Sequence, residues 1–163
     1  KSKIMKSVIN FANSGGLLMG ICNGFQILTE TELLPGILLR NKHAEFICKN
    51  VFVKISDNEN SYFKNIKKKT LELHIAHNEG NYFCSNKQMK EIEDHNQVAL
   101  LYCDKNGEIN ESSNPNGASK NIAGIFNKKK NILGMMPHPE RLIDPLLSGE
   151  DGSIMFESLL KSH

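Results

Sequence analysis

The chain has 163 residues, enough for one domain with its own hydrophobic core, and its composition is that of an ordinary globular protein. Its formal net charge of +2 is too small for a nucleic-acid-binding surface or a polybasic membrane patch. There is no signal peptide or membrane-spanning apolar run, and the four cysteines are too widely spaced for a zinc site or a dense disulfide framework. We therefore expect a cytoplasmic protein.

The first thirty-two residues predict a helix, a strand, a tight turn and a second helix, which is an α/β unit. Apolar residues recur at helical spacing over 3–12. The run GLLMGI (16–21) is apolar throughout, like a strand buried on both faces of a parallel sheet. Helical spacing returns over 23–32.

The remainder of the chain predicts mainly strands, with a short exposed helix over 88–96. A lysine-rich turn joins the last two strands as a hairpin, and a closing helix from Ser153 to Lys161 should bury Ile154, Phe156, Leu159 and Leu160. With no internal repeat or linker, residues 1–163 are predicted to form a single domain. The predicted strands are 45–55, 70–77, 97–103, 121–126 and 131–136.

A G-x-C-x-G motif lies between the first strand and the second helix and centres on Cys22. It is the thiol counterpart of the nucleophile elbow, and we expect Gly20 and Gly24 to be required because backbones approach closely on both sides. The helix N-terminus should lower the Cys22 pKa, and the Asn23 N–H would face an oxyanion. A packed cysteine in a glycine-containing turn is the alternative, and the motif alone does not decide between them.

A base for this thiol is offered by the segment MMPHPERL. Pro139 forces His138 into an extended conformation, where residues two apart share a face, so Glu140 could orient the imidazole. The segment directly follows a predicted strand, a usual position for catalytic residues in α/β folds. Alternatively, Glu140 pairs with Arg141 and His138 is an ordinary loop histidine.

The other histidines carry weaker signals. His74 and His77 fall on opposite faces of a strand, which argues against a metal site, but His77 ends its strand in HNEG and could reach a pocket. No phosphate-binding glycine loop is present, so we expect no ATP site and no cofactor in this chain.

Taken together, several segments resemble the class I glutamine amidotransferases and, within them, the glutaminase subunits of phosphoribosylformylglycinamidine synthase in purine biosynthesis. The resemblance covers essentially the whole chain and implies an α/β fold: a flavodoxin-like three-layer sandwich with a mostly parallel central sheet. The segments are GICNGFQIL, LLPGILLRN, AHNEGNYF, NPNGASKNIAGI, LGMMPHPER and GEDGSIMFESLL.

The resemblance implies a catalytic triad of Cys22, His138 and Glu140 that hydrolyses L-glutamine to glutamate and ammonia. By it, the ammonia passes to an ATP-dependent synthetase subunit, which converts formylglycinamide ribonucleotide to formylglycinamidine ribonucleotide. ATP and magnesium belong to that partner, and a small bridging subunit completes the complex. No nucleic acid or membrane partner is implied.

The resemblance also implies the residues around the substrate: Gly20, Asn23, Gln26 and His77. Two departures are small, Asn78 where glycine is usual and Ala118 where serine is usual. Both concern loop detail.

The larger departure from the family pattern is at the N-terminus, where the chain starts at Lys1, one predicted strand before Cys22. Family members begin with further strands and a glycine-rich loop, so we expect the domain to lack roughly its first sixty residues and its second oxyanion donor. This leaves two alternatives open: a catalytically inactive fragment or structural piece of the complex, and a related thiol hydrolase acting on γ-glutamyl or peptide substrates.

Overall fold

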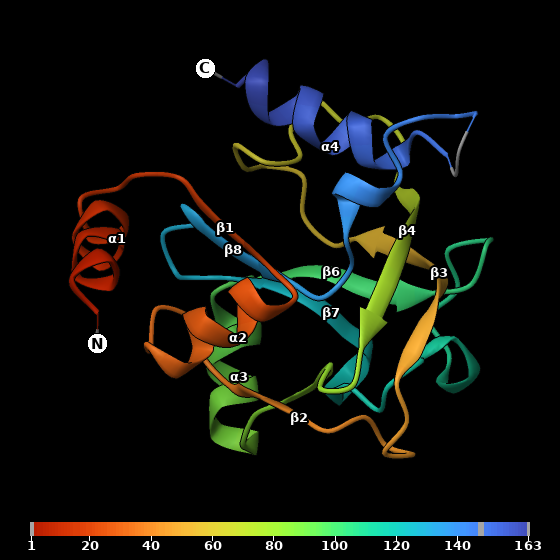
Figure 1. The fold of residues 1–163 in the computed structure, drawn as a ribbon, viewed down its shortest axis with the longest axis horizontal. Coiled ribbons are helices and arrows are strands. Elements are labelled where there is room, and N and C mark those ends of the chain that lie inside the picture. The colour runs from red at the N-terminus through yellow and green to blue at the C-terminus, as the bar shows by residue number, and fades with distance from the viewer. Residues whose placement is uncertain (1, 147–148, 163) are drawn as a thin grey trace.

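The computed structural model describes residues 2–146 and 149–162, in which a curled six-stranded sheet is flanked by helices (Figure 1). Its strand order is β1-β8-β7-β6-β3-β4, and β2 and β5 form a separate two-stranded sheet. The strands are β1 (Leu18–Ile21), β2 (Ile37–Leu39), β3 (Ile47–Ile55), β4 (Thr70–His77), β5 (Asn81–Phe83), β6 (Val98–Cys103), β7 (Ile122–Phe126) and β8 (Ile132–Met135). The helices are α1 (Lys3–Asn13), α2 (Asn23–Glu30), α3 (Asn86–Asp94), α4 (Asp151–Leu160) and the short 3-10 helices η1 (Glu111–Ser113), η2 (Ser119–Asn121) and η3 (Pro139–Arg141).

The predicted elements are present with small shifts at their ends. The alternating segment 70–77 is β4, and the last two predicted strands form the antiparallel hairpin β7–β8. Ser85 begins α3 with a capping box, in which its side chain accepts the Gln88 N–H while the Gln88 side chain accepts the Ser85 N–H. The short strands β2 and β5 have no predicted counterpart, because three residues are too few to show a periodicity.

The α/β class is confirmed, but the direction of strand pairing differs from the expected, mostly parallel sheet. Among the described strands, β1 and β8 pair in parallel, and the other pairings of the sheet are antiparallel. The reason is connectivity. Parallel neighbours need a long crossover, usually helical, whereas β7 and β8 are joined by the short turn 127–131 and β3 reaches β4 through a loop without an α-helix.

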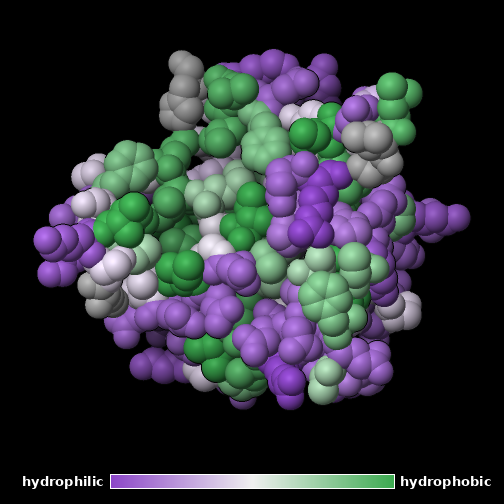
Figure 2. All heavy atoms as spheres, viewed as in Figure 1, coloured by the Kyte–Doolittle hydropathy of each residue, from purple (hydrophilic) through white to green (hydrophobic). Residues whose placement is uncertain are grey.

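Strand β1 is at the edge of this sheet, so it is not buried on both faces as predicted. Gly20 is buried, but Leu18, Met19 and Ile21 are only half-buried among the described residues. Figure 2 shows apolar side chains gathered on the side of the molecule where α1 and β1 lie. Helix α1 is present where the apolar spacing predicts it, but some of its apolar residues, such as Phe11, are exposed.

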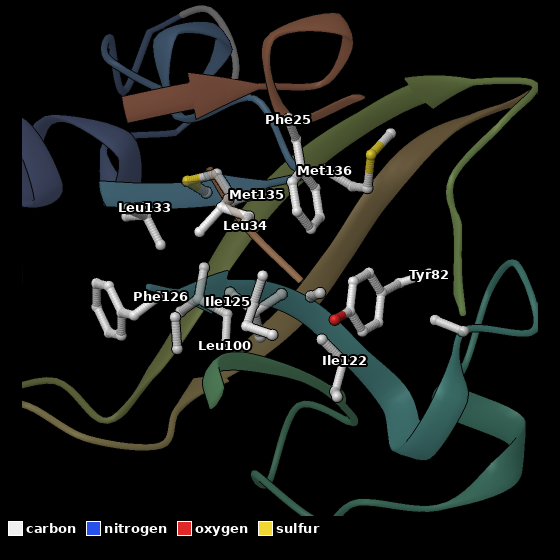
Figure 3. Packing of buried hydrophobic residues seen from close by; sticks show 14 of the residues in the cluster. Phe25, Leu34, Tyr82, Leu100, Ile122, Ile125, Phe126, Leu133, Met135 and Met136 are labelled. Carbon is white, nitrogen blue, oxygen red and sulfur yellow. The ribbon is translucent and has the colours of Figure 1, made fainter. Parts of the chain in front are cut away.

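The core holds α2 against the parallel strands. Figure 3 shows the Phe25 side chain pointing into a cluster that includes Leu34, Met135 and Tyr82. The Phe25 and Tyr82 rings are stacked with their centroids 5.8 Å apart, and Phe25 is fully buried. Because Phe25 lies three residues after Cys22, this packing fixes the start of α2 and the turn that precedes it.

The closing helix α4 buries a different face from the predicted one. Gly152, Met155 and Ser158 are buried, whereas Leu160 is 77% exposed. The predicted Ile154, Phe156 and Leu159 are half-buried. The first turn of α4 packs against η3, where the Gly152 N–H donates to Leu142 O at 2.8 Å. This contact, which hydrophobic periodicity does not encode, sets the orientation of the helix.

Candidate active site

Two chain segments meet where the parallel strands β1 and β8 end side by side (Figure 1). Ile21 is paired with Met135, and the Cys22 N–H donates to Met135 O at 2.9 Å. His138 follows three residues after Met135, and its N–H donates to His74 O in β4 at 2.7 Å. The sheet thus curls until β4 contacts the segment after β8. This arrangement brings the cysteine and the histidine to the same end of the sheet, as expected for an α/β site.

Cys22 adopts the strained conformation of an elbow, with φ of 52° and ψ of −106°. A Cβ on Gly20 would lie 2.7 Å from the carbonyl atoms of Gly24, so the strand and helix approach too closely there for any side chain. Gly24 differs, because a Cβ there meets no atom within 4 Å. The structure therefore supports the elbow and the need for Gly20, and it contradicts the expected crowding at Gly24.

His138 contacts Glu140 through a different geometry from the predicted one. His138 itself is extended, but Pro139 begins the 3-10 helix η3, so the two side chains meet across a tight turn and not along an extended face. His138 Nδ1 lies 2.5 Å from Glu140 Oε1. Arg141 Nε is 4.0 Å from the same oxygen, so the alternative partner is present but farther away.

The second imidazole nitrogen is the unusual atom of the site. His138 Nε2 is buried and has no hydrogen-bond partner among the described residues. A buried polar atom without a partner costs about 1–3 kcal/mol, so such atoms are rare outside functional sites. With Nδ1 facing a carboxylate, the Nε2 lone pair is free to accept a proton.

A cleft of about 450 Å³ brings most of the predicted site residues together, which is a suitable size for a small metabolite. The Gln26 N–H donates to Cys22 O at 3.1 Å, and its side-chain amide donates to Glu30 at 2.9 Å. Gly20 does not line the cleft, because it lies beneath α2. The lining residues are Cys22, Asn23, Gln26, Phe46, Ala76, His77, Asn78, Glu79, His138 and Arg141.

Burial raises the pKa of the Cys22 thiol above its ordinary value. A hydrogen bond from the Asn23 N–H and the positive charge of Arg141 lower this pKa, but burial outweighs them. The predicted lowering of the Cys22 pKa is therefore wrong. A thiol whose pKa is raised needs a neighbouring base before it can act as a nucleophile.

His77 reaches the cleft as predicted, but both of its ring nitrogens are engaged. Asn41 Oδ1 lies 3.1 Å from His77 Nδ1, and Asn116 Nδ2 lies 3.4 Å from His77 Nε2. Burial lowers the pKa of His77 to about 4, so the ring is neutral. Asn41 and Asn116 were absent from the sequence-based site. Their signal lay in the segments LLRN and NPNG, which carried the family resemblance without a stated role.

His74 faces away from the cleft, as the spacing predicts, and contacts Cys48 and Asn50 on β3. Among residues 2–146 and 149–162, no group of three or more histidine, cysteine or acidic side chains could hold a metal ion. No helix in the described part of the chain is long and apolar enough to cross a membrane.

Residues 1–150 match the profile of the CobB/CobQ-like glutamine amidotransferase domain. The chain belongs to the glutamine amidotransferase family, the class that the cysteine elbow and its histidine partner also indicate. Within it, the chain groups with PurQ subunits. It is 70% identical over 162 residues to the phosphoribosylformylglycinamidine synthase subunit PurQ of Pelagibacter ubique (strain HTCC1062), covering 99% of this chain and 71% of that protein.

Further relatives and solved structures are similar to this chain over most of its length. The PurQ subunit of Synechocystis sp. is 48% identical over 158 residues, covering 96% of this chain and 70% of that protein. Among solved structures, PurLQS from Thermotoga maritima matches with a TM-score of 0.84 and 36% identity, over 99% of this chain and 68% of that one. Another glutamine amidotransferase from Thermotoga maritima, 15% identical with a TM-score of 0.54 over 96% of this chain and 64% of that one, shares the fold.

Proposed function

We propose that this chain is the glutaminase subunit of phosphoribosylformylglycinamidine synthase and that Cys22, His138 and Glu140 carry the reaction. The unpaired, buried His138 Nε2 is the observation that supports this most, because His138 lines the same cleft as Cys22, whose thiol lies at a strained elbow. Family membership and the identity to PurQ subunits support the side-chain amide of L-glutamine as the substrate class.

In the reaction, His138 Nε2 takes the Cys22 thiol proton as the sulfur attacks the amide carbon of glutamine. Glu140 keeps the proton on Nδ1 and stabilises the imidazolium that forms. The Asn23 N–H, which is directed at the sulfur, supports the developing oxyanion. His138 then gives its proton to the departing ammonia, and water hydrolyses the thioester to release glutamate and regenerate the thiol.

The ammonia would pass to an ATP-dependent synthetase subunit for the conversion of formylglycinamide ribonucleotide to formylglycinamidine ribonucleotide. The support is the likeness to PurLQS of Thermotoga maritima, whose name joins PurQ with two further components. We place ATP and magnesium on the synthetase, a small bridging subunit in the same complex, and no cofactor on this chain. We also place the protein in the cytoplasm.

The test uses the complex reconstituted with the full-length subunit. Cys22→Ala should abolish glutamine-dependent synthesis and leave ammonia-dependent synthesis intact, because the thiol acts only in ammonia release. Cys48→Ala is the matched control, since Cys48 is exposed on β3 and lies outside the cleft. Normal glutamine use by Cys22→Ala would refute the proposal. Turnover of γ-glutamyl peptides in place of glutamine would instead support the thiol hydrolase.

A further inference from the structure

One wall of the cleft is a short loop to which buried polar side chains make hydrogen bonds. The loop follows β4 and runs from His77 to Gly80, and its middle residues Asn78 and Glu79 line the cleft. This wall lies beside the nucleophile, because Ala76 O, one residue earlier, is 3.9 Å from Cys22 Sγ. A small displacement of the loop would therefore change the space next to the reacting sulfur.

Asn41 binds this loop at both ends. Its Oδ1 accepts the Gly80 N–H at 2.9 Å, and its Nδ2 donates to His77 O at 2.9 Å. The Asn41 N–H also donates to Asn78 O at 2.9 Å. One asparagine thus makes hydrogen bonds to three of the four loop residues.

Asn116 completes the network from a distant part of the chain. Its side chain is fully buried, and its Nδ2 donates to Gly80 O at 2.8 Å and to the Tyr102 hydroxyl at 3.2 Å. Its own carbonyl accepts the Lys42 N–H at 2.9 Å, which ties the Asn116 segment to the Asn41 segment. The two asparagines therefore brace the same loop, and the Lys42–Asn116 backbone hydrogen bond joins their segments.

The orientation of the Asn41 amide determines which ring nitrogen of His77 carries the proton. Asn41 Nδ2 donates to two carbonyls, those of Glu45 and His77, so Oδ1 must face the ring and His77 Nδ1 must carry the proton. The other nitrogen, Nε2, lies 3.4 Å from Asn116 Nδ2, whose two hydrogens go to the shorter contacts with Gly80 O and the Tyr102 hydroxyl. The His77 ring is therefore held by Asn41 through Nδ1 and packed beside Asn116 at Nε2, a position in which it serves as a brace for the loop.

We propose that Asn41 and Asn116 are positioning residues for glutamine, acting through His77 to hold loop 77–80 as the rigid wall of the substrate cleft. The inference rests on the proposed glutaminase function. It predicts that loss of either side chain weakens glutamine use, because the wall shifts beside Cys22, and leaves the partner's use of ammonia untouched.

The experiment compares Asn41→Ala and Asn116→Ala with Asn131→Ala in the reconstituted complex. Asn131 is a matched control, since it is also buried and its Nδ2 also donates to two backbone carbonyls, but these belong to Ala12 and Gly16 and not to loop 77–80. We expect the KM for L-glutamine to rise about tenfold or more in the first two variants and less than about twofold in the control. The ammonia-dependent rate should stay within about twofold in all three.

An unchanged KM in Asn116→Ala, or an equal rise in Asn131→Ala, would overturn the inference. If Asn116→Ala does not fold, Asn41→Ser and His77→Gln test the same network, and the same rise in KM is expected. Failure of the proposed function is distinguishable from these results, because the unmodified complex would then not use glutamine at all.

Discussion

Replacing Gly152 by alanine would place a methyl group inside the turn that carries His138 and Glu140. The added Cβ would lie 1.8 Å from Pro139 O and 2.7 Å from Leu142 O, distances that real Cβ atoms do not show. Both obstacles are backbone atoms, so no side-chain rotation relieves the clash. Helix α4 and η3 must separate by about 1 Å or more.

Gly24 provides a matched control, because it is the second residue of α2 as Gly152 is the second residue of α4. Alanine at Gly24 meets no atom within 4 Å, so Gly24→Ala shows the helix-propensity gain alone, at most about 1 kcal/mol. Overpacking costs about 1–3 kcal/mol, and a clash between backbones belongs at the upper end. The two variants should therefore differ by about 3 kcal/mol in the free energy of unfolding, equivalent to about 6–12 °C in Tm.

Urea and thermal unfolding of the two full-length variants measure this difference. The Gly152→Ala complex should also lose glutaminase turnover, by up to about a hundredfold for a 1 Å displacement of His138, with ammonia-dependent synthesis retained. If Gly152→Ala is as stable as Gly24→Ala and retains full glutaminase turnover, the close packing of α4 on η3 does not position the histidine, and the reasoning is refuted.

Two further predictions concern pH. Burial lowers the pKa of His77 to about 4, so the unfolded chain binds this proton first, and stability that is full above about pH 6.5 is lost as the pH falls towards 4. This loss amounts to about 3 kcal/mol in the free energy of unfolding. The free energy of unfolding of His77→Gln should therefore depend less steeply on pH between about 4 and 6.5. The same pH dependence in His77→Gln and the unmodified protein would contradict the prediction. Because burial raises the pKa of Cys22, its alkylation by iodoacetamide, followed by mass spectrometry of the Cys22 peptide, should still increase above pH 9; a plateau below pH 8 would contradict this.

Local patterns predicted most of the elements because strands and helices have short periods. The alternation over 70–77 matches β4 residue for residue, with its odd-numbered residues facing the core. The prolines around His138 placed it in an extended conformation next to a carboxylate, and the structure contains that contact. The reason given for the contact was wrong, because Pro139 starts a tight turn, and turn type depends on what the following residues pack against.

Features that depend on distant contacts were not predictable in the same way. The strands β2 and β5 are three residues each, pair only with each other in the described sheets, and are separated by more than forty residues. The raised pKa of Cys22 comes from burial, which the motif around it does not reveal. The hydrogen bonds of Asn41 and Asn116 reach residues more than thirty-five positions away.

The sequence by itself determined the G-x-C-x-G motif, the contact of His138 with Glu140 and the order of the secondary structure, because each depends on neighbours within a few residues. Only the tertiary structure decided that Gly20 and not Gly24 is crowded, that burial raises the pKa of the Cys22 thiol, and that Asn41 contacts His77. The physical reason is that steric clash, desolvation and buried hydrogen bonds depend on atoms that the folded chain brings together from separate segments.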